Sequence, residues 1–474
     1  MIPAGKTSAV APTGDVCAIV LAAGLGTRMR SSLVKVLHPL NGLPMVAHVL
    51  DLCRRMGVKR TLGVIGHQSE RLREALGDFP VEFVEQAEQR GTAHAVLQTE
   101  AALQGFEGDV LVINGDVPLL GETLIERLLA THRKAGADAT LVTTRLPNPT
   151  GYGRVVRDRR GVFRKIVEEV EATPAERRVR EINAGIYCFR GPRLFTCLHG
   201  VKPSPVKGEF YLPEVLPMLR KARGKIATVQ AEDSQEVLGI NTRAELAEAY
   251  GILRQRVVAR LMEGGVTCLD PATTHVSMLA TVGGDTTLYP NVQLEGKSSI
   301  GTGCTIHAGC RIRDSHLGNR VMVLDGCVIL ESEIADDCTI GPFAHLRPRC
   351  QVKRRAKVGN FVEVKKSVIG EGSKVPHLTY VGDTTVGERV NIGAGTITCN
   401  YDGFGKHQTI IEDEAFIGSN ANLVAPVKIG RGAIVAAGST ITQEVPPDAL
   451  AFGRAQQVNK EGRAAEIRNA KAKK

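Results

Sequence analysis

The sequence predicts two domains of different class, an α/β Rossmann-like domain followed by a left-handed parallel β-helix, joined by a long helix. Three observations support this prediction. Apolar strands alternate with amphipathic helices in the first half, a glycine-poor helical stretch follows, and a hexapeptide repeat fills most of the second half. A chain of 474 residues is long enough for two or three domains, each with its own core.

In the first half, short apolar runs alternate with segments of helical spacing. The predicted strands are 18–21, 81–84, 110–113 and 139–142, and the predicted helices include 45–56 and 124–135. This alternation is typical of a mostly parallel sheet, whose ligands bind at the carboxyl ends of the strands. Leu21 and the sequence Asn114-Gly115-Asp116 both lie at such ends.

A glycine-rich, basic turn follows the first strand. The sequence Leu21-Ala22-Ala23-Gly24 leads to Arg28, and Lys35 follows. Glycine lets backbone N–H groups approach an anion closely, and the two cations add mobile positive charge. The spacing matches neither the P-loop nor the full dinucleotide fingerprint. We therefore predict a phosphate-binding loop, with a plain tight turn as the alternative.

Residues 243–264 are rich in Ala, Glu, Leu and Arg, and no glycine lies between Ile252 and Met262. This composition predicts one long helix. We expect a helical linker at 244–264 between an N-terminal domain, 1–243, and a C-terminal domain, 265–474.

Aliphatic residues recur every six positions in the second half. Each hexad is expected to supply one strand and one turn, with the aliphatic side chain in a narrow core. Hexapeptide-repeat proteins coil left-handed, against the usual crossover rule. A polar insertion, 398–407, interrupts the repeat, and such insertions often carry function. The aliphatic positions are Ile334, Ile340, Leu346, Val352, Val358, Val364, then Ile369, Val375, Val381, and then Ile411, Ile417, Leu423, Ile429, Val435 and Ile441.

The composition favours small anionic ligands over macromolecular partners. Lys and Arg total 60 against 50 Asp and Glu, which gives a net charge of +10. Only 4% of residues are aromatic, and no basic segment is interleaved with stacking rings, so we expect no nucleic-acid partner. The basic tail, 460–474, is expected to be a solvated helix end.

The compartment expected from the sequence is the cytoplasm. No run of about 18 apolar residues predicts a membrane span, and the first sixteen residues lack the apolar core of a secretion signal. The eleven cysteines include no Cys-x-x-Cys pair. They are therefore expected to be reduced packing residues rather than bridges or metal ligands.

Longer motifs in both halves carry a specific resemblance. They are 21–29, 35–38, 86–92, 115–118, 151–154 and 181–183 in the first half, and 346–348, 358–365, 377–380 and 391–403 in the second. From about Cys17 to Arg454 the chain resembles the bifunctional bacterial enzymes that make UDP-N-acetylglucosamine, a precursor of peptidoglycan and lipid A. The resemblance implies an N-terminal uridylyltransferase and a C-terminal N-acetyltransferase that acts on glucosamine-1-phosphate.

For the uridylyltransferase, the resemblance implies attack of N-acetylglucosamine-1-phosphate on UTP, with release of pyrophosphate. Arg28 and Lys35 are the predicted catalytic cations, because this chemistry needs positioning and charge neutralisation. Gly153, Glu168 and Asn183 are expected to hold the amino-sugar, although Glu168 alone would pass for a solvated charge. The full predicted set for UTP and UDP-N-acetylglucosamine is Leu21, Ala22, Ala23, Gly24, Lys35, Gln86, Gly91, Thr92, Asn114, Gly115, Asp116, Gly153, Glu168, Asn183 and Asn241.

The predicted metal ligands are Asp116 and Asn241. A hard cation such as Mg²⁺ takes oxygen ligands and few protein groups, so one carboxylate and one amide oxygen suffice beside phosphates. Asp116 is the obvious carboxylate at a strand end, and the resemblance supplies Asn241. The alternative role for Asn241 is the N-cap of the helix that follows.

A few positions depart from the family pattern. They are Ser32, Val34, Ala184 and the pair Pro213-Glu214. None is assigned to phosphate or metal, so the departures concern substrate affinity and the edge of the sugar pocket.

For the acetyltransferase, His377 is the predicted catalytic base, because an ammonium must lose a proton before it can attack a thioester. Its alternative is an ordinary surface or core histidine. Arg347 and Lys365 are 18 residues apart, one full turn of three hexads, so they should stack along one face as a phosphate clamp. The resemblance adds Tyr380 and Asn391 for the sugar-phosphate.

The resemblance also places acetyl-CoA in a groove between adjacent copies, and so implies a homotrimer. Lys406, in the projecting insertion, would reach a partner subunit. The predicted acetyl-CoA residues are Ala394, Asn400, Tyr401, Lys406, Ser419, Ala437 and Arg454.

Two other interpretations remain open at this point. The chain could be a single-activity sugar nucleotidyltransferase whose β-helix only assembles subunits. It could also be a basic scaffold that binds nucleic acid or anionic surfaces. The combination of His377, Tyr380 and the Asn400-Tyr401 insertion favours the bifunctional enzyme.

Overall fold

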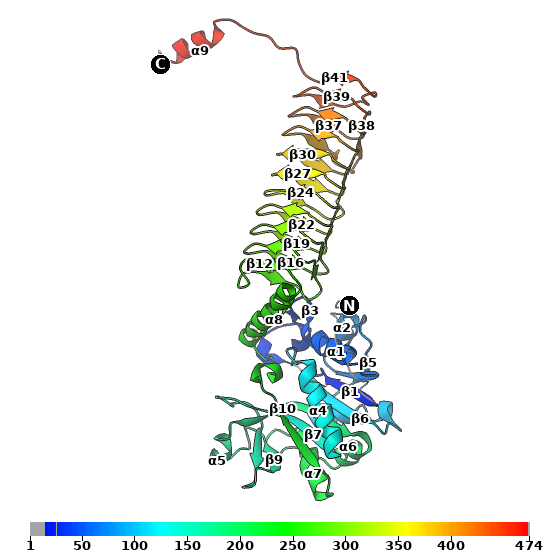
Figure 1. Cartoon of the computed structure of the whole chain (residues 1–474), viewed down its shortest axis with the longest axis vertical. Helices are drawn as coiled ribbons and strands as arrows, with labels where there is room; N and C mark the ends of the chain where they lie inside the picture. The colour runs from blue at the N-terminus through cyan, green and yellow to red at the C-terminus, as the bar shows by residue number, and fades with distance from the viewer. Residues whose placement is uncertain (1–14, 25, 473–474) are drawn as a thin grey trace. The chain divides into compact units, whose positions relative to one another are not determined.

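The structure, a computed structural model, describes residues 15–24 and 26–472 (Figure 1). It divides into two compact units at Arg254/Gln255, and each is described by itself. In the part of the chain described, no helix combines the length and apolar character needed to span a membrane.

The N-terminal unit is built on one mixed sheet of nine strands. The main path is β11-β7-β10-β6-β1-β4-β5, and β10 runs antiparallel to both β6 and β7 while the other pairs on this path are parallel. The hairpin β8–β9 joins this sheet because β8 pairs with β10. The strands are β1 Val16–Leu21, β4 Arg60–Ile65, β5 Glu82–Glu85, β6 Asp109–Asn114, β7 Ala139–Arg145, β8 Arg154–Arg157, β9 Phe163–Val167, β10 Glu181–Arg190 and β11 Ile226–Gln230. A separate short pair is β2 Pro39–Leu40 and β3 Leu43–Pro44.

Helices cover both faces of this sheet, because alternate residues of its buried strands point to opposite sides. Leu141 of β7 packs in a core cluster with residues of α3, α6 and α7. The neighbouring Thr140 points the other way and bonds to His132 of α4. The helices are α1 Met45–Arg55, α2 Ser69–Ala75, α3 Thr92–Leu97, α4 Glu122–Ala135, α5 Pro174–Arg177, α6 Gly191–Leu198 and α7 Val215–Lys221, with 3₁₀ turns η1 Thr27–Met29, η2 Lys35–Leu37, η3 Ala101–Leu103, η4 Leu212–Glu214 and η5 Ser234–Val237. The predicted strands and helices of this half are present, each within a few residues of its expected bounds.

The long helix α8 spans Arg243–Glu263. Its first turn has a capping box, because the Thr242 hydroxyl accepts from the Glu245 N–H and the Glu245 carboxylate accepts from the Thr242 N–H. The last helix, α9 Arg463–Ala472, has no buried residue and lies in the basic tail.

The second unit is a left-handed parallel β-helix, in which successive coils stack and three parallel sheets form the sides (Figure 1). The first sheet contains β12 Thr267–Cys268, β15 Thr287–Leu288, β18 Thr305–Ile306, β21 Met322–Val323, β24 Thr339–Ile340, β27 Lys357–Asn360, β30 Lys374–His377, β33 Asn391–Ile392, β36 Phe416–Ile417, β39 Ile434–Val435 and β41 Leu450–Ala451. The second contains β13 His275–Val276, β16 Gln293–Glu295, β19 Arg311–Arg313, β22 Val328–Leu330, β25 His345–Leu346, β28 Glu363–Lys365, β31 Tyr380–Gly382, β34 Ile397–Cys399, β37 Asn422–Val424 and β40 Thr440–Ile441. The third contains β14 Thr281–Val282, β17 Ser299–Ile300, β20 His316–Leu317, β23 Glu333–Ile334, β26 Gln351–Val352, β29 Val368–Ile369, β32 Thr384–Val386, β35 Thr409–Ile411 and β38 Val427–Ile429.

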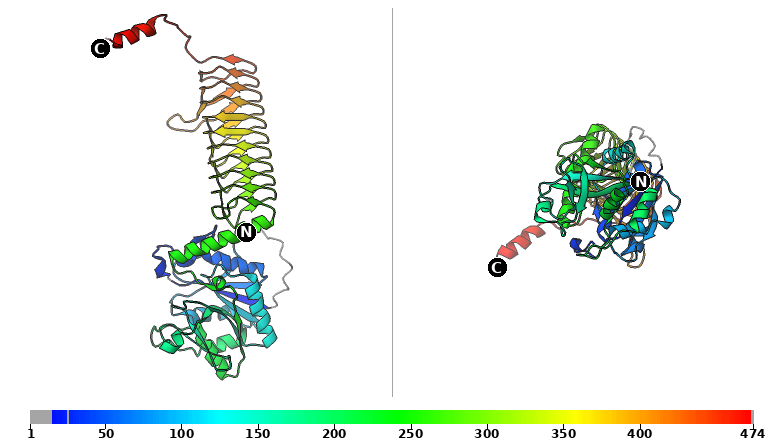
Figure 2. Two further views of the ribbon diagram at one scale, coloured as in Figure 1. Left: turned by 60° about the vertical axis from the view of Figure 1, so that its left-hand side comes forward. Right: turned by 90° about the horizontal axis from the view of Figure 1, so that it is seen from below.

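The predicted aliphatic positions all lie in the core of this unit. Cysteines at Cys304, Cys310 and Cys338 are buried among them as free thiols, which confirms their predicted packing role. The coils differ in length by one residue, because His345 pairs with Glu363, 18 residues later, whereas Lys357 pairs with Lys374, 17 residues later. Between β34 and β35 a loop projects from the side of the β-helix (Figure 2).

Candidate active sites

Two adjoining cavities open at the carboxyl ends of β1 and β6 in the N-terminal unit. Cavity A has a volume of ≈ 470 Å³ and cavity B of ≈ 360 Å³. They share Leu21, Thr92, Asn114 and Asp116. Cavity A is also lined by Ala22, Ala23, Gly24, Lys35, Gln86 and Gly91. Cavity B is also lined by Arg28, Gly153, Glu168, Asn183 and Asn241.

Of the residues predicted for this site, Gly115 lines neither cavity. Its backbone N–H donates to the Leu21 carbonyl oxygen at 2.8 Å and so joins the ends of the two strands. A Cβ on Gly115 would lie 3.0 Å from that oxygen, which leaves little space for a side chain. Gly115 is therefore placed to shape the floor of the site.

The two predicted metal ligands converge on one point. The Lys35 ammonium is ion-paired with the Asp116 carboxylate and donates to Asn241 Oδ1 at 3.0 Å. Arg28 Nη2 also donates to Asn241 Oδ1, at 2.9 Å. A hard carboxylate oxygen and a hard amide oxygen thus share one cationic partner, and this donor set fits Mg²⁺.

Asn241 is not the N-cap of α8, so that alternative is wrong. The cap is Thr242, whose hydroxyl accepts from the Glu245 N–H at 3.2 Å. The Asn241 backbone N–H donates to the Glu245 carboxylate at 2.6 Å, and this leaves the Asn241 side chain directed at Lys35 and Arg28. The helix start therefore orients Asn241 without using its amide.

Cavity B has an acidic and amide-lined wall. A Cβ on Gly153 would lie 3.0 Å from Glu168 Oε1, so a glycine permits this close approach. Asn183 donates from Nδ2 to the Tyr187 hydroxyl at 2.6 Å, beside a bulge in β10. Burial, and then the nearby Glu171, raises the pKa of Glu168 above its usual range. Glu168 is therefore not a freely solvated charge.

A buried arginine lies behind this wall. Arg154 is 1% exposed, and its guanidinium donates to the Tyr152 carbonyl and to the Glu169 carboxylate at 2.5 Å. Glu169 also accepts from the Gly151 N–H at 3.3 Å. The guanidinium and carboxylate thus connect the chain segments that carry Gly153 and Glu168.

In the β-helix, His377 lies in a column of residues on successive coils of the first sheet. Asn360 pairs with His377 in the strand register. On the following coils, the Asn420 N–H donates to the Ala394 carbonyl at 2.7 Å and the Gly438 N–H donates to the Ser419 carbonyl at 2.8 Å. Arg454 Nη1 donates to the Ala437 carbonyl at 2.9 Å. The column consists of Asn360, His377, Ala394, Ser419 and Ala437.

The His377 ring is exposed and oriented by one neighbour. Its Nδ1 atom bonds to Asn360 Oδ1. An amide oxygen only accepts, so Nδ1 donates, and in the neutral ring this contact favours the tautomer whose lone pair is on Nε2. This is the tautomer that a general base at Nε2 requires.

Arg347, Lys365 and Tyr380 lie together on or beside the second sheet. Arg347 Nη1 donates to Glu363 Oε1 at 2.8 Å, and Glu363 pairs with Tyr380 in the register. Lys365 Nζ lies 3.9 Å from Asp383 Oδ2. The two cations are on adjacent coils, as the spacing predicted, and each has a carboxylate partner.

Asn391 does not join this group within the chain. It belongs to β33 of the first sheet, whereas Tyr380 belongs to β31 of the second. That Tyr380 and Asn391 complete one sugar-phosphate site stays a prediction.

The projecting loop is braced internally. Lys406 Nζ lies 4.4 Å from the centroid of the Tyr401 ring, and the Tyr401 hydroxyl donates to the Gly403 carbonyl at 2.6 Å. Asn400 is buried at the foot of the loop and donates from Nδ2 to Asp383 at 2.6 Å. A cavity of ≈ 370 Å³ between the loop and the coils is lined by Lys406 and Asp383 but not by His377.

Sequence reasoning missed three residues that support these sites. Asn360 and Asp383 lie 17 residues before His377 and Asn400, one coil earlier, so the shortened stride was a signal for both. Arg154 belongs to the motif at 151–154, but nothing in the sequence indicates that its guanidinium is buried.

Comparisons with known proteins agree with both halves of the structure. A family model described as the MobA-like NTP transferase domain matches residues 18–184. A model described as the bacterial transferase hexapeptide, with six repeats, matches residues 408–443.

Relatives called bifunctional protein GlmU match almost the whole chain. The Geobacillus thermodenitrificans protein is 49% identical over 454 residues, covering 96% of this chain and 98% of its own length. The Heliobacterium modesticaldum protein is 49% identical over 444 residues, covering 94% and 96%. The Listeria monocytogenes protein is 46% identical over 454 residues, covering 96% and 99%. The chain therefore belongs to the GlmU family of bifunctional enzymes, which carry a nucleotidyltransferase domain and a hexapeptide-repeat acetyltransferase domain.

Proposed function

We propose that this chain makes UDP-N-acetylglucosamine in two steps, with the residues of the β-helix column acetylating glucosamine-1-phosphate and those of cavities A and B transferring uridylyl to the product. The convergence of Lys35, Asp116 and Asn241 at the junction of two cavities is the observation that best supports the second step. For the first step it is the alignment of His377 with Ala394 and Ser419 on successive coils.

In uridylyl transfer, cavity A would hold the nucleotide and cavity B the sugar-phosphate. Gln86 is 3% exposed at the wall of cavity A and would face the uracil. Lys35 and Arg28 would leave their contacts with Asn241 to neutralise the triphosphate and the departing pyrophosphate. Because Asp116 lines both cavities, it lies where the two substrates would meet.

We infer that Asp116 and Asn241 hold Mg²⁺ during this step. Both oxygens already accept from the Lys35 ammonium, so they are oriented toward a shared cation. When bound, Mg²⁺ supplies charge neutralisation at the phosphates. The remaining ligands would come from phosphate oxygens and water.

In acetyl transfer, Nε2 of His377 would take a proton from the substrate ammonium, and the free amine would then attack the thioester carbonyl. Arg347 and Lys365 would exchange their carboxylate partners for the substrate phosphate. Acetyl-CoA would lie along the column, past Ala394, Ser419 and Ala437, toward Arg454. We assign Asn400 and Tyr401, which follow β34 of the second sheet at the foot of the projecting loop, to acetyl-CoA as well.

We also infer a homotrimer, in which Asn391 and Lys406 serve a site shared between copies. Asn391 lies on another sheet from Tyr380, and the Lys406 loop extends away from its own coils. Light scattering on the purified chain would measure this oligomeric state.

Paired single substitutions test the two assignments in the full chain. Asp116→Asn should abolish pyrophosphate release from UTP and N-acetylglucosamine-1-phosphate while leaving CoA release with glucosamine-1-phosphate intact. His377→Asn should do the opposite. If His377→Asn left acetyl transfer unchanged, the base assignment would be wrong, and absence of CoA release by the unsubstituted chain would favour a β-helix that only assembles subunits.

A further inference from the structure

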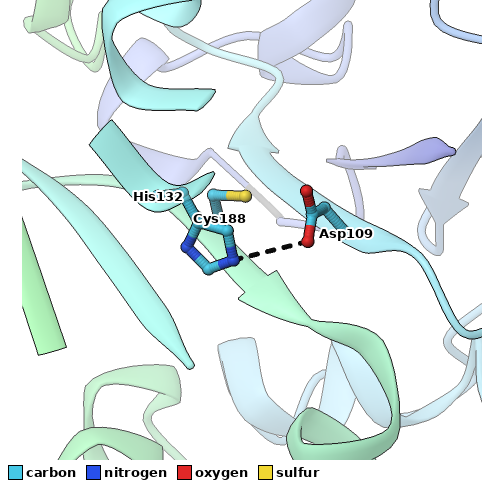
Figure 3. A group of neighbouring side chains, drawn as sticks. All are labelled: Asp109, His132 and Cys188. Atoms are coloured by element: carbon cyan, nitrogen blue, oxygen red, sulfur yellow. Dashed lines mark ion pairs between the residues drawn. The ribbon is translucent and has the colours of Figure 1, made fainter. Parts of the chain in front are cut away.

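A second group of chemically active side chains lies in the N-terminal unit, away from both cavities. Asp109 begins β6, His132 lies in the last turn of α4, and Cys188 lies in β10 (Figure 3). One ligand atom from each lies within 4.8 Å of those from the other two. Asn114, which lines both cavities, is at the opposite end of β6, so this cluster lies at the other end of the strands from the proposed reaction site.

In this cluster one nitrogen of His132 is hydrogen-bonded to Thr140 and the other faces Asp109. The side chain is 1% exposed, and Nδ1 bonds to Thr140 Oγ1 at 2.9 Å. Nε2 faces Asp109 Oδ1 at 3.4 Å, the ion-pair contact dashed in Figure 3, but it makes no hydrogen bond in the structure described. A buried ring nitrogen whose carboxylate neighbour is too poorly aligned for a hydrogen bond is costly, and a cation bound between the two would remove this cost.

The separation of the nitrogen and oxygen ligands suits a small tetrahedral cation, and the sulfur lies within 4.8 Å of both. Two oxygen or nitrogen ligands at ~2.0–2.1 Å from Zn²⁺ in tetrahedral geometry are about 3.3 Å apart. The observed separation of Nε2 and Oδ1 is 3.4 Å. Thr140 orients the ring through the other nitrogen, as the partners of metal-bound histidines commonly do.

The charges around the cluster act in both directions on a bound cation. Burial raises the pKa of the Cys188 thiol well above its usual range, so without a cation the thiol is neutral. The carboxyl end of α4 points its negative dipole end toward this region. Arg133 approaches the other carboxylate oxygen of Asp109, with Nε 3.5 Å from Oδ2, which leaves Oδ1 on the His132 side.

We propose that Asp109, His132 and Cys188 form a structural binding site for a divalent cation of the Zn²⁺ class. On binding, the Cys188 thiol releases its proton to solvent and the sulfur forms a bond to the cation, so that one thiolate and one carboxylate balance the double charge. Asp109 is partly exposed, with 19% of its side-chain surface accessible, and gives water a route to the fourth position. The cation would tie β6, α4 and β10 together.

Co²⁺ is the probe for this site, because a cobalt–thiolate bond gives an intense near-ultraviolet charge-transfer band and an oxygen-only site gives none. The full chain is stripped with a chelator, saturated with Mg²⁺ and titrated with Co²⁺. We expect the band to saturate at one equivalent per chain, and Zn²⁺ to displace it. Stoichiometric binding should also raise the midpoint of thermal unfolding.

Cys188→Ser should abolish the band, and His132→Gln should weaken Co²⁺ binding about tenfold or more. Cys197→Ser is the matched control, because this cysteine lies on α6 of the same unit outside the cluster and should keep the band. Both cysteine variants should retain Mg²⁺-dependent uridylyl transfer. No band in the unsubstituted chain would overturn the proposal in favour of a simple Asp109–His132 ion pair, and a band that survives Cys188→Ser would also overturn it.

Discussion

At the residue scale, Lys35 is proposed to exchange its protein partners for the substrate phosphates during the reaction. In the free protein its ammonium bonds to both Asp116 and Asn241, the oxygens proposed for the metal. A cation that already occupies this point must leave before another can bind there. Lys35 therefore opposes metal binding until phosphates draw it away.

We predict that Lys35→Met strengthens the binding of Mn²⁺ to the nucleotide-free chain by about tenfold, or ~1.4 kcal/mol. The change stays below the ~4 kcal/mol repulsion of two unit charges 4 Å apart at an effective dielectric of 20. Electron paramagnetic resonance of free Mn²⁺ measures this affinity without turnover. Unchanged or weaker Mn²⁺ binding would contradict the competition, whereas loss of uridylyl transfer is expected in any case.

Asn360 acts through His377 rather than on the substrate. Asn360→Ala removes the acceptor that holds the His377 tautomer, so we predict a fall in kcat for acetyl transfer of about tenfold, a part of the ~10²–10⁴-fold that a positioned base contributes. Uridylyl transfer should not change. Asn422→Ala, which removes only a contact with Thr440, is the control and should leave both rates intact. A normal acetylation rate in Asn360→Ala would show that the ring needs no such support.

Arg154 is predicted to set the affinity for the sugar-phosphate. Lysine cannot reach both the Tyr152 carbonyl and Glu169, so Arg154→Lys should loosen the segments that carry Gly153 and Glu168. We expect KM for N-acetylglucosamine-1-phosphate to rise about tenfold, or ~1.4 kcal/mol, with KM for UTP little changed.

The control for Arg154 lies on the same strand. Arg157 makes a similar paired contact with Glu181, at 2.6 and 2.8 Å, but lines neither cavity. Arg157→Lys should leave both KM values near those of the unsubstituted chain. If Arg154→Lys raised KM equally for both substrates, the change would indicate general destabilisation instead of a role in sugar binding.

At the element scale, the repeat determines which side chains meet. The six-residue spacing was enough to predict the core positions and the stacking of Arg347 with Lys365, because period and face are linked in a β-helix. The same spacing cannot predict partners such as Glu363, since rotamers of exposed side chains depend on neighbours on other coils. In the N-terminal unit, strand ends placed Leu21 and Asp116 correctly, but the burial of Arg154 depends on how the β8–β9 hairpin folds back.

The projecting loop is an insertion that leaves the coil unchanged. Thr384 pairs with Thr409, whereas Tyr380 pairs with Ile397, so residues 401–408 are extra to the regular stride. Deleting 401–408 would leave Asn400 as a single corner residue, as Asp383 is one coil earlier.

We predict that this deletion changes the free energy of unfolding by only about 1 kcal/mol, because loop length costs little. It should nevertheless reduce acetyl transfer at least about 100-fold, since Tyr401 and Lys406 are lost, with uridylyl transfer retained. Chemical denaturation and the two product assays measure these effects. Full acetylation by the shortened chain would exclude the loop from the site.

At the scale of the whole molecule, the two units have separate cores. The β-helix core runs along its coils with nearest-neighbour packing, and the α/β core is formed by its sheet with helices such as α3, α6 and α7. Each proposed site draws its residues from one unit, so each ligand should stabilise only the unit that binds it.

Differential scanning calorimetry should therefore resolve two unfolding transitions in the full chain. UTP with Mg²⁺ at about 100 times its Kd adds ~2.7 kcal/mol to one unit, which corresponds to a Tm increase of about 5–10 °C for a domain of this size. Acetyl-CoA should shift the other transition by a similar amount and leave the first in place. Asp116→Asn should remove only the response to UTP with Mg²⁺, because the proposed metal ligand belongs to the N-terminal unit. A single transition that moves with either ligand would mean that the units unfold together, and that binding at one site stabilises the other.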